Sequence, residues 1–374
     1  MKSKIIGFDG SRSFLKEKTG TENYSYQLLK ALAKLDHKNQ YIVYLRTQGV
    51  PLRGWPRNFE FRVINWPRLW TQAGLAGQTF TDQLDVLFVP AHTIPLVRRP
   101  GLKTVVTVHD LGSEYLPGMH QLKQRLYLGF MQRHQLKNAT KIIAVSNATK
   151  KDLVNKIGLD PDKIEVVYEG YDQEKFKGQN SKVKNKEYFL FVGTVQPRKN
   201  LERIIIAFSR QLSASRQKTK KSEDRRLMTD DYLVIAGSKG WLSDEIYKLP
   251  KKLGIEDRVK FLGRVEDQDL PALYSGAIAL VFPSLFEGFG LPILEAQASG
   301  CPVITSNISS MPEVAGKGAI LVNPESVDDI VRGMMEIGEI KGIREGLIKK
   351  GLENVKRFSW EKAAKKTLKV LEAL

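Results

Sequence analysis

Short apolar runs alternate with helical stretches along this chain, in two successive sets. Runs such as 103–108 and 277–282 are rich in aliphatic residues, short, and bounded by Pro, Gly or polar residues, which is typical of buried parallel strands. Strands that alternate with helices predict an α/β fold with helices covering each sheet. The 374 residues are too many for one ordinary core. We therefore expect two Rossmann-like domains that face each other across a cleft.

A polar, lysine-rich segment separates the two sets and is the expected domain boundary. The predicted parts are an N-terminal domain at 1–171, a linker at 172–187, a C-terminal domain at 188–358 and a final helix at 359–374. Ser359 is a suitable N-cap for that helix. Inside the second domain, residues 213–230 are charged and nearly devoid of apolar side chains, so a loop is expected there.

The composition limits the partners and the compartment. The net charge of +18 suits nucleic acid, an anionic membrane surface or anionic substrates. No helix-turn-helix, RNP or zinc-finger pattern occurs, so nucleic acid is not an expected partner. No run approaches the ~20 apolar residues of a membrane-spanning helix, the N-terminus lacks signal-peptide anatomy, and Cys301 is the single cysteine. These features favour the reducing cytoplasm.

The stretch 284–300, S-L-F-E-G-F-G-L-P-I-L-E-A-Q-A-S-G, is the most informative for function. Gly288 and Gly290 bracket Phe289, and such a loop can turn backbone N–H groups toward an anion. Pro292 suits the first turn of a helix, which places a helix N-terminus beside the loop. Helix N-termini favour phosphate.

Glu287 and Glu295 flank this predicted phosphate site. Because a carboxylate would repel a diphosphate, each is better used to accept hydrogen bonds from sugar hydroxyls on either side of it. This arrangement predicts a nucleotide-sugar site. A glycine-rich turn with surface glutamates is the alternative, and spacing alone leaves both open.

The segment E-G-F-G-L-P-I-L-E resembles the E-x7-E signature of retaining GT-B glycosyltransferases of family 4, the glycosyltransferase group 1. The resemblance extends over nearly the whole chain. It implies that Glu287 contacts hydroxyls of the donor sugar and that Glu295 holds the ribose. It also implies that the final helix packs back across the cleft. The loop and helix start between the two glutamates would bind the donor through Gly288, Phe289, Gly290 and Leu291.

Two cations stand together in G-T-V-Q-P-R-K-N, at 193–200. Arg198 and Lys199 precede a helix, where positive charge is unfavourable unless an anion is bound. The resemblance implies that these side chains contact the donor diphosphate. Many members also carry Arg where this chain has Thr194, so the two would supply the charge alone. A solvated basic turn is the alternative.

Further donor-site residues follow strand ends of the second domain. Gly193 and Gly237 each end a predicted strand at the cleft. Arg264 and Val265 lie in a loop that resembles the one receiving the nucleotide base through its backbone. G-S-K-G-W-L at 237–242 resembles mannosyl-type members, which favours GDP-mannose as donor and leaves UDP-sugars open.

In the first domain, His92 and His109 each follow a strand, where open α/β sheets bind ligands. T-V-H-D-L resembles the strand-end His of the family, which implies that His109 approaches the donor sugar with Asp110 beside it. His92 is an acceptor-side candidate, although a lone His is more often structural. Y-E-G-Y-D resembles the interdomain element, with Glu169 where Asn is usual.

Gly20 and Thr21 resemble the glycine-rich turn after the first strand, on the acceptor side. The family pattern carries more glycine, whereas Glu22 and Asn23 follow here.

The resemblance implies that a hexose moves from a nucleoside diphosphate to a hydroxyl of a glycan or lipid-linked acceptor, with retention of configuration, as in polysaccharide biosynthesis. Two D-x-D matches, 160–162 and 267–269, read as turns, so no metal and no cofactor are expected. A GT-B epimerase or phosphorylase, or a non-enzymatic basic binding protein on this scaffold, is the alternative.

A helix predicted at 120–138 mixes apolar residues with Lys123, Arg125, Arg133 and Lys137 on one side. Such mixing suits a helix lying at a lipid interface. It predicts a cytoplasmic enzyme placed peripherally on the inner face of the cell membrane. A solvated basic helix is the alternative.

Overall fold

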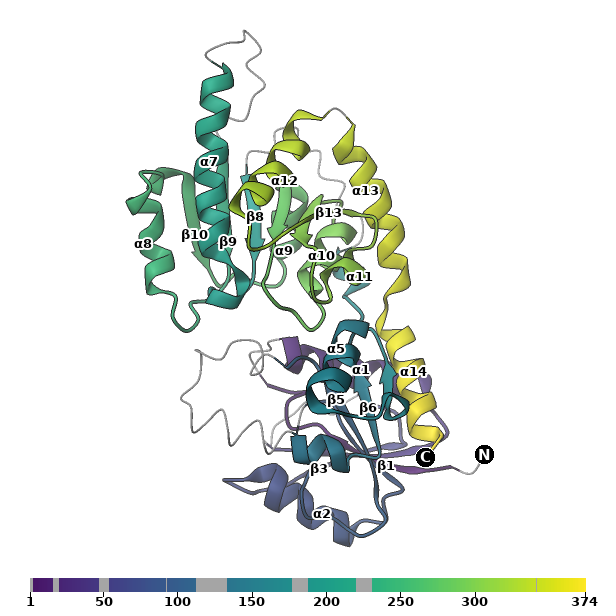
Figure 1. Ribbon diagram of the computed structural model, residues 1–374. Helices are drawn as coiled ribbons and strands as arrows, with labels where there is room; N and C mark the ends of the chain where they lie inside the picture. The colour runs from purple at the N-terminus through teal and green to yellow at the C-terminus, as the bar shows by residue number, and fades with distance from the viewer. Residues whose placement is uncertain are drawn as a thin grey trace. The chain divides into compact units, whose positions relative to one another are not determined.

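The computed structural model describes residues 3–15, 20–46, 54–91, 93–111, 133–176, 188–219, 231–340 and 342–374. The chain forms two compact units (Figure 1). One contains Met1–Gly170 together with Phe358–Leu374, and the other contains Tyr171–Arg357. Each unit is built on its own parallel sheet.

The first sheet has seven strands in the order β3-β2-β1-β4-β5-β6-β7, and all its pairings are parallel. Its strands are β1 Ile5–Asp9, β2 Gln40–Leu45, β3 Phe59–Val63, β4 Val86–Val89, β5 Lys103–Val108, β6 Lys141–Ala144 and β7 Ile164–Val166. The four residues of β4 are all buried, as the continuous apolar run predicts for a strand covered on both faces.

The second sheet has six strands in the order β10-β9-β8-β11-β12-β13, again all parallel. Its strands are β8 Tyr188–Val192, β9 Tyr232–Ala236, β10 Val259–Gly263, β11 Ala279–Phe282, β12 Val303–Ser306 and β13 Ala319–Val322. The prediction of two parallel-sheet, Rossmann-like domains is confirmed.

In both sheets the strand order reverses beside the first strand of the unit. The reversal lies between β1 and β4 in the first sheet and between β8 and β11 in the second. Open α/β sheets bind ligands at their carboxyl edge beside such a reversal. The sequence motifs at 193–200 and 284–290 follow β8 and β11, so they meet at the reversal of the second sheet.

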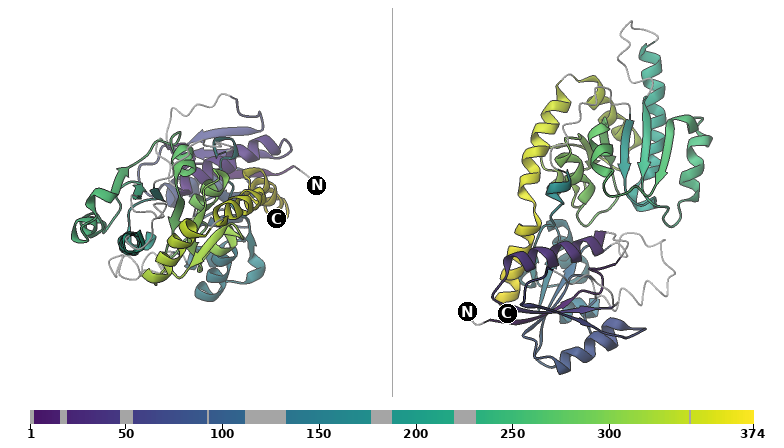
Figure 2. Two further views of the ribbon diagram at one scale, coloured as in Figure 1. Left: turned by 90° about the horizontal axis from the view of Figure 1, so that it is seen from above. Right: turned by 180° about the vertical axis from the view of Figure 1, so that it is seen from behind.

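Helices of the first unit include one that comes from the far end of the sequence. The helical elements are α1 Gly20–Leu35, the π-helical turn η1 Trp70–Leu75, α2 Ala76–Thr81, α5 Asn147–Ile157, η3 Pro161–Lys163 and α14 Trp360–Glu372. Figure 2 shows α14 beside α1, with which it is in contact. Ser359 caps α14 by accepting a hydrogen bond from the Lys362 N–H, as predicted.

Gly170 shows why the Y-E-G-Y-D segment needs glycine. A Cβ at this position would lie 2.2 Å from the backbone nitrogen of Trp360, so only glycine lets the segment meet the start of α14. The terminal helix, although it follows the second unit in sequence, thus belongs to the first unit.

The second unit carries the remaining helices. They are α6 Gln173–Phe176, η4 Pro197–Lys199, α7 Leu201–Thr219, α8 Asp244–Lys252, η5 Glu256–Arg258, α9 Leu270–Gly276, α10 Leu291–Ala298, α11 Met311–Ala315, α12 Val327–Glu339, α13 Ile343–Asn354 and η6 Val355–Arg357. The predicted loop at 213–230 is wrong in its first part, because α7 continues to Thr219. A lack of apolar residues predicts a lack of burial, whereas Ala, Arg, Gln and Lys are all good helix formers.

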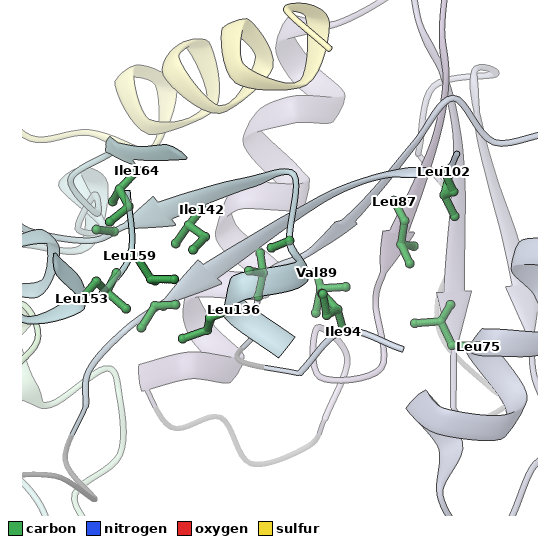
Figure 3. Close-up of a cluster of buried hydrophobic side chains, with 14 of the residues drawn as sticks. Leu75, Leu87, Val89, Ile94, Leu102, Leu136, Ile142, Leu153, Leu159 and Ile164 are labelled. Carbon is green, nitrogen blue, oxygen red and sulfur yellow. The ribbon is translucent and has the colours of Figure 1, made fainter. Parts of the chain in front are cut away.

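The core of the first unit joins β4, β5 and β6 to the helices on one face of the sheet (Figure 3). Leu87, Val106 and Ile142 are fully buried in it, and Leu153 of α5 belongs to the same cluster. At about 25 cal/mol per Å² of apolar surface, each such side chain stabilises the fold by roughly 1.5–3 kcal/mol. This packing fixes the ends of the strands from which the polar loops extend.

None of the helices in the described ranges is long and apolar enough to cross a bilayer.

Candidate functional site

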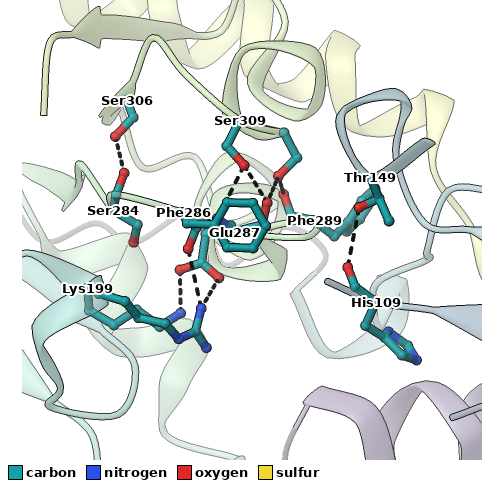
Figure 4. A network of polar contacts seen from close by, with 11 residues as sticks. His109, Thr149, Lys199, Ser284, Phe286, Glu287, Phe289, Ser306 and Ser309 are labelled. Carbon is teal, nitrogen blue, oxygen red and sulfur yellow. Dashed lines mark hydrogen bonds and ion pairs between the residues drawn. The ribbon is translucent and has the colours of Figure 1, made fainter. Parts of the chain in front are cut away.

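The carboxylate of Glu287 lies between two cations (Figure 4). Lys199 Nζ donates to Glu287 Oε1 at 2.5 Å, and Arg198 Nη1 donates to Oε2 at 3.1 Å. Glu287 and Lys199 are buried, with 7% and 8% of their surfaces exposed. Two positive charges and one negative charge leave this triad with one net positive charge, which suits an anionic ligand.

The two cations are placed by backbone contacts between the loops after β8 and β11. The Leu285 N–H donates to the Arg198 carbonyl at 2.9 Å. Asn200, with a left-handed φ of 63°, donates through its side chain to the carbonyls of Pro283 and Pro324 at 2.9 and 2.7 Å. Asn tolerates this conformation better than most residues. Asn200 therefore ties the cationic turn to the glutamate loop.

The same surroundings set the charge of Glu287. Burial alone would raise its pKa, but the nearby Lys199 and Arg198 outweigh burial and hold the pKa below its ordinary value. Glu287 is therefore an ionised carboxylate at neutral pH, which accepts hydrogen bonds and donates none.

Two serines fix the backbone of the loop between the glutamates. The Ser309 hydroxyl donates to the Glu287 carbonyl at 2.7 Å, and the Ser310 hydroxyl lies 2.9 Å from the carbonyls of Glu287 and Phe289. In a planar trans peptide the C=O and the next N–H point in opposite directions. The N–H groups of Gly288 and Gly290 are therefore directed away from the serines.

The helix after this loop begins without a side-chain cap. Gly290 is the N-cap of α10, with φ 103°, and no side chain accepts from the first N–H groups. Leu291 and Pro292 form the first turn. The structure thus contains the loop-to-helix turn that the glycines and proline predict, with its helix N-terminus beside the triad loop.

Glu295 has different surroundings. It lies on α10, half-buried, and Tyr274 of α9 donates its hydroxyl to Glu295 Oε2 at 2.8 Å. Burial raises the pKa of Glu295; the Tyr274 hydrogen bond and Lys175 oppose this, while Asp267 and Asp172 add to it. The carboxyl group is thus held by a neutral donor, and no Lys or Arg in the described part of the chain forms an ion pair with it.

Glycines shape the neighbouring strand ends. A Cβ on Gly237 would lie 1.9 Å from the Gly193 carbonyl oxygen, so the ends of β8 and β9 approach as closely as only glycine allows. The Gly237 N–H donates to the Gly263 carbonyl at 2.7 Å. Arg264, exposed, and Val265, half-buried, follow directly. The predicted base-binding positions thus lie at the carboxyl edge of β8, β9 and β10.

In the first unit, His109 follows β5 and is 9% exposed. Its Nδ1 lies 3.1 Å from Glu169 Oε1 and its Nε2 lies 3.0 Å from the Pro90 carbonyl oxygen. Tyr24 of α1 packs edge-on against the ring at 4.5 Å. Thr149 donates to the His109 carbonyl at 3.3 Å.

These two contacts restrict the protons of His109. A carbonyl only accepts, so Nε2 carries a proton. One further proton must then lie between Nδ1 and Glu169. Burial lowers the pKa of His109, but the Glu169 carboxylate, the Pro90 carbonyl and Asp110 raise it above its ordinary value overall. Both ring nitrogens are therefore engaged in hydrogen bonds, and His109 cannot act as a base without breaking one of these contacts.

The remaining predicted residues fall in three places. Gly20 and Thr21 form the first turn of α1, and Asp110 is half-buried directly after His109. His92 lies outside the described residues, as does 120–132 of the predicted interfacial helix. Arg133 and Lys137 are exposed on the described remainder. No group of three His, Cys, Asp or Glu that could hold a metal ion occurs among the residues described.

The structure adds residues that motif reading missed. Asn200 directly follows the two cations, and a residue that favours left-handed backbone after a turn is a readable signal. Ser309 and Ser310 could not be found in this way, because only the packing of the loop after β12 brings them to the glutamate loop. Tyr274 precedes β11 and reads as an apolar helix residue.

Two family models match the chain. The model described as "Glycosyltransferase Family 4" matches residues 18–175, and the model described as "Glycosyl transferases group 1" matches residues 172–354. The second contains the motifs at 193–200 and 284–300.

Relatives are similar over most of the chain. The O-antigen chain mannosyltransferase B of Escherichia coli is 28% identical over 73% of this chain and 71% of its own length. An uncharacterised glycosyltransferase of Methanocaldococcus jannaschii is 30% identical over 83% of both chains.

Solved structures share the fold at low identity. Sucrose-phosphate synthase from Thermosynechococcus elongatus superposes with a TM-score of 0.77 at 18% identity, covering 99% of this chain and 98% of its own. Anabaena HepE in complex with UDP-glucose superposes with a TM-score of 0.71 at 18% identity, covering 99% of both chains. These likenesses confirm the GT-B fold. The chain is a glycosyltransferase and belongs to family 4, the group 1 glycosyltransferases.

Proposed function

We propose that this glycosyltransferase moves a mannosyl residue from GDP-mannose to a hydroxyl of a glycan or lipid-linked acceptor, with retention of configuration, during polysaccharide assembly. The observation that carries the proposal is the triad of Glu287, Lys199 and Arg198 at the strand-order reversal of the second sheet. It combines a buried, ionised hydrogen-bond acceptor with two cations in one place.

A donor diphosphate would compete with Glu287 for the two cations. The phosphate oxygens take the charge-assisted hydrogen bonds of Lys199 and Arg198, which frees the Glu287 carboxylate to accept from sugar hydroxyls. Charge that develops on the leaving diphosphate then meets cations already fixed by Asn200 and the loop backbone. Such preorganised charge stabilises a transition state more than a ground state.

The acceptor attacks, by the family resemblance, from the face that the diphosphate leaves, so that a phosphate oxygen takes the hydroxyl proton. The acceptor oxygen–carbon bond forms as the anomeric carbon–phosphate oxygen bond breaks, and the proton passes to the departing diphosphate. The reaction needs no divalent cation in this proposal, because Lys199, Arg198 and the N-terminus of α10 supply the positive potential.

Two observations support GDP-mannose as the donor. The relative from Escherichia coli is named as a mannosyltransferase, and G-S-K-G-W-L resembles mannosyl-type members. The HepE structure holds UDP-glucose, which makes UDP-sugars the second candidates.

Thermal-shift measurements against GDP-mannose, UDP-glucose and other nucleotide-sugars test the donor, since a ligand that binds the native state stabilises it by mass action. GDP-mannose should give the largest rise in melting temperature. Addition of EDTA should change neither this rise nor the transfer rate. A larger rise with a UDP-sugar would replace the proposed donor. An inverted anomeric configuration by NMR of the product would contradict retention, and activity lost with EDTA and restored by Mg²⁺ or Mn²⁺ would contradict metal independence.

A further inference from the structure

A cavity of about 460 Å³ lies in the first unit. Its volume is within the ~300–1,000 Å³ of small-molecule sites. Ser11 and Arg12 follow β1, Arg46 follows β2, and Thr93 follows β4 by a few residues. The cavity thus lies at the carboxyl edge of the first sheet where its strand order reverses, the position at which such sheets bind ligands.

Arg12 and Arg46 are the charged side chains among the described residues that line this cavity. Arg12 is held in place, because its Nη1 donates to Glu22 Oε1 at 2.8 Å. Glu22 is buried in the first turn of α1, so it anchors the arginine from behind. A guanidinium with one nitrogen anchored has other N–H donors left for a second oxyanion. Arg46 is exposed at the end of β2.

Hydroxyl, amide and apolar groups complete the lining. Ser11, Thr71, Gln72 and Thr93 offer hydrogen bonds, and Leu15 with Leu69 offers apolar surface. Gln72 is fixed by its own contacts, donating to the Ile94 carbonyl at 3.1 Å and accepting from the Leu96 N–H at 2.9 Å. A mixture of fixed polar groups and apolar faces suits a saccharide, whose rings have both.

The wall at Leu69 is conformationally costly. Leu69 has a left-handed φ of 51° and is 75% exposed, and the π-helical turn Trp70–Leu75 begins at the next residue. Left-handed backbone is unfavourable for leucine, and π-helical turns and strained residues gather at ligand sites. The strained residue is therefore one of those that line the cavity.

We propose that this cavity is the acceptor subsite and that it selects an acceptor bearing a phosphomonoester or similar anionic group, bound by Arg12 and Arg46. The proposal rests on the proposed function in taking the ligand to be the acceptor. It deepens that function by making the acceptor anionic. The departure from the glycine-rich family pattern then has a role, because Glu22 orients Arg12.

Isothermal titration with glucose 6-phosphate, and with glucose as the uncharged control, tests the site. The whole protein should bind glucose 6-phosphate at least about tenfold more tightly than glucose, and added salt should weaken the difference. Arg12→Gln/Arg46→Gln should reduce phosphate-dependent affinity about tenfold or more. Lys103→Gln, which removes one charge at the opposite edge of the sheet where β5 begins, should bind as wild type.

Three further arms make the result decisive. Arg46→Gln alone keeps Arg12 paired with Glu22 and should still weaken binding if the double variant fails to fold. Lys199→Ala should leave glucose 6-phosphate binding unchanged, which separates this cavity from the triad. Farnesyl phosphate distinguishes the source of the anion, because tighter binding than glucose 6-phosphate through the same arginines would assign a lipid-linked acceptor and weaker binding a soluble one.

Equal affinity of wild type and Arg46→Gln for both phosphates, or equal affinity for glucose and glucose 6-phosphate, would overturn the proposal. A different result would contradict the proposed function but not the anion site. Glucose 6-phosphate would then bind through Arg12 and Arg46 while no nucleotide-sugar stabilised the protein.

Discussion

Glu287 and Glu295 stand at the two ends of the E-x7-E motif, yet the fold gives them opposite surroundings. Glu287 contacts Lys199 and Arg198, and these cations hold its pKa below the ordinary value against the effect of burial. Glu295 contacts the hydroxyl of Tyr274, and burial raises its pKa. A sequence motif with two identical residues thus contains one carboxylate that is fixed as an anion and one that is closer to neutrality.

The difference indicates a division of roles. A carboxylate among cations takes part in a charge balance that changes when a diphosphate enters and again when it leaves. A carboxyl group held by a neutral phenol has no counter-cation that a diphosphate could take. It therefore suits contacts that are the same before and during the reaction. We therefore expect substitutions at the two ends to separate effects on turnover from effects on donor binding.

The largest expected effect is on turnover in Lys199→Ala. One preorganised charge-assisted contact to a developing anion is worth about 2.7–4 kcal/mol, so kcat should fall by roughly 10²–10³-fold. Lys252→Ala, at an exposed lysine on α8, is the control and should stay within about twofold. Steady-state kinetics with the identified donor measures both, and a kcat for Lys199→Ala near the wild-type value would remove Lys199 from the diphosphate site.

The next effect is on stability, where Glu287→Gln and Glu295→Gln should differ in sign. Glu287→Gln leaves buried Lys199 without its countercharge, which costs roughly 3 kcal/mol. Burial opposes ionisation of the Glu295 carboxyl group. Glu295→Gln replaces that group with a neutral amide, so the melting temperature at pH 7 should be unchanged or higher. Equal losses in both variants would mean that the two environments do not differ in the way the contacts indicate.

The pH dependence of these variants follows from the same shifts. A lowered native pKa gives stability that is present above the unfolded value of about 4.3 and is lost as the pH falls through the native pKa. A raised native pKa gives stability that is present below the unfolded value and is lost as the pH rises through the native pKa. Glu287→Gln should therefore flatten the acid limb of the melting profile, and Glu295→Gln should flatten the decline toward neutral pH.

The sequence predicts the strands and the two motif glutamates, but it does not predict the side chains that surround each glutamate. The run 103–108 predicts β5 with the bounds that the structure shows, and the run 277–282 contains β11, which begins at Ala279. Short aliphatic runs between polar loops favour buried strands. The contact of Glu287 with Lys199 joins residues 88 positions apart and depends on β8 and β11 being neighbours in the sheet. Tyr274 lies on a helix whose sequence offers no sign that one hydroxyl points at α10. Side-chain environments therefore came only with the packing.

A smaller effect is expected in Glu295→Ala, on donor affinity. Contacts to a ribose exist in both the ground state and the transition state, so their loss raises KM and leaves kcat within a fewfold. Removal of one hydrogen-bond partner costs about 1–3 kcal/mol, so a rise in KM of about fivefold or more is expected. Glu353→Ala, at an exposed glutamate of α13, should behave as wild type. A fall in kcat equal to that of Lys199→Ala would show that the two glutamates do not divide the roles.

The smallest effect, in Tyr274→Phe, tests the cause of the difference most directly. The substitution removes only the hydroxyl that donates to Glu295. Because that hydrogen bond lowers the Glu295 pKa against burial, its loss should move the pKa further upward. A neutral hydrogen bond contributes about 1 kcal/mol, so the donor KM at neutral pH should rise by roughly fivefold or less. The rise should shrink as the pH increases, because a higher pH opposes protonation of the carboxyl group.

Tyr188→Phe is the matched control, because the Tyr188 hydroxyl donates to the Leu273 carbonyl of the same helix, α9, at 2.7 Å and does not contact Glu295. Both substitutions remove one hydroxyl from the surroundings of α9, so a general loosening of that helix would raise KM in both without a change in its pH dependence. A pH-dependent KM in Tyr274→Phe alone would assign the effect to the Glu295 carboxyl group. A pH-independent KM in both variants would instead mean that the tyrosine holds α9 in place and does not tune the carboxyl group.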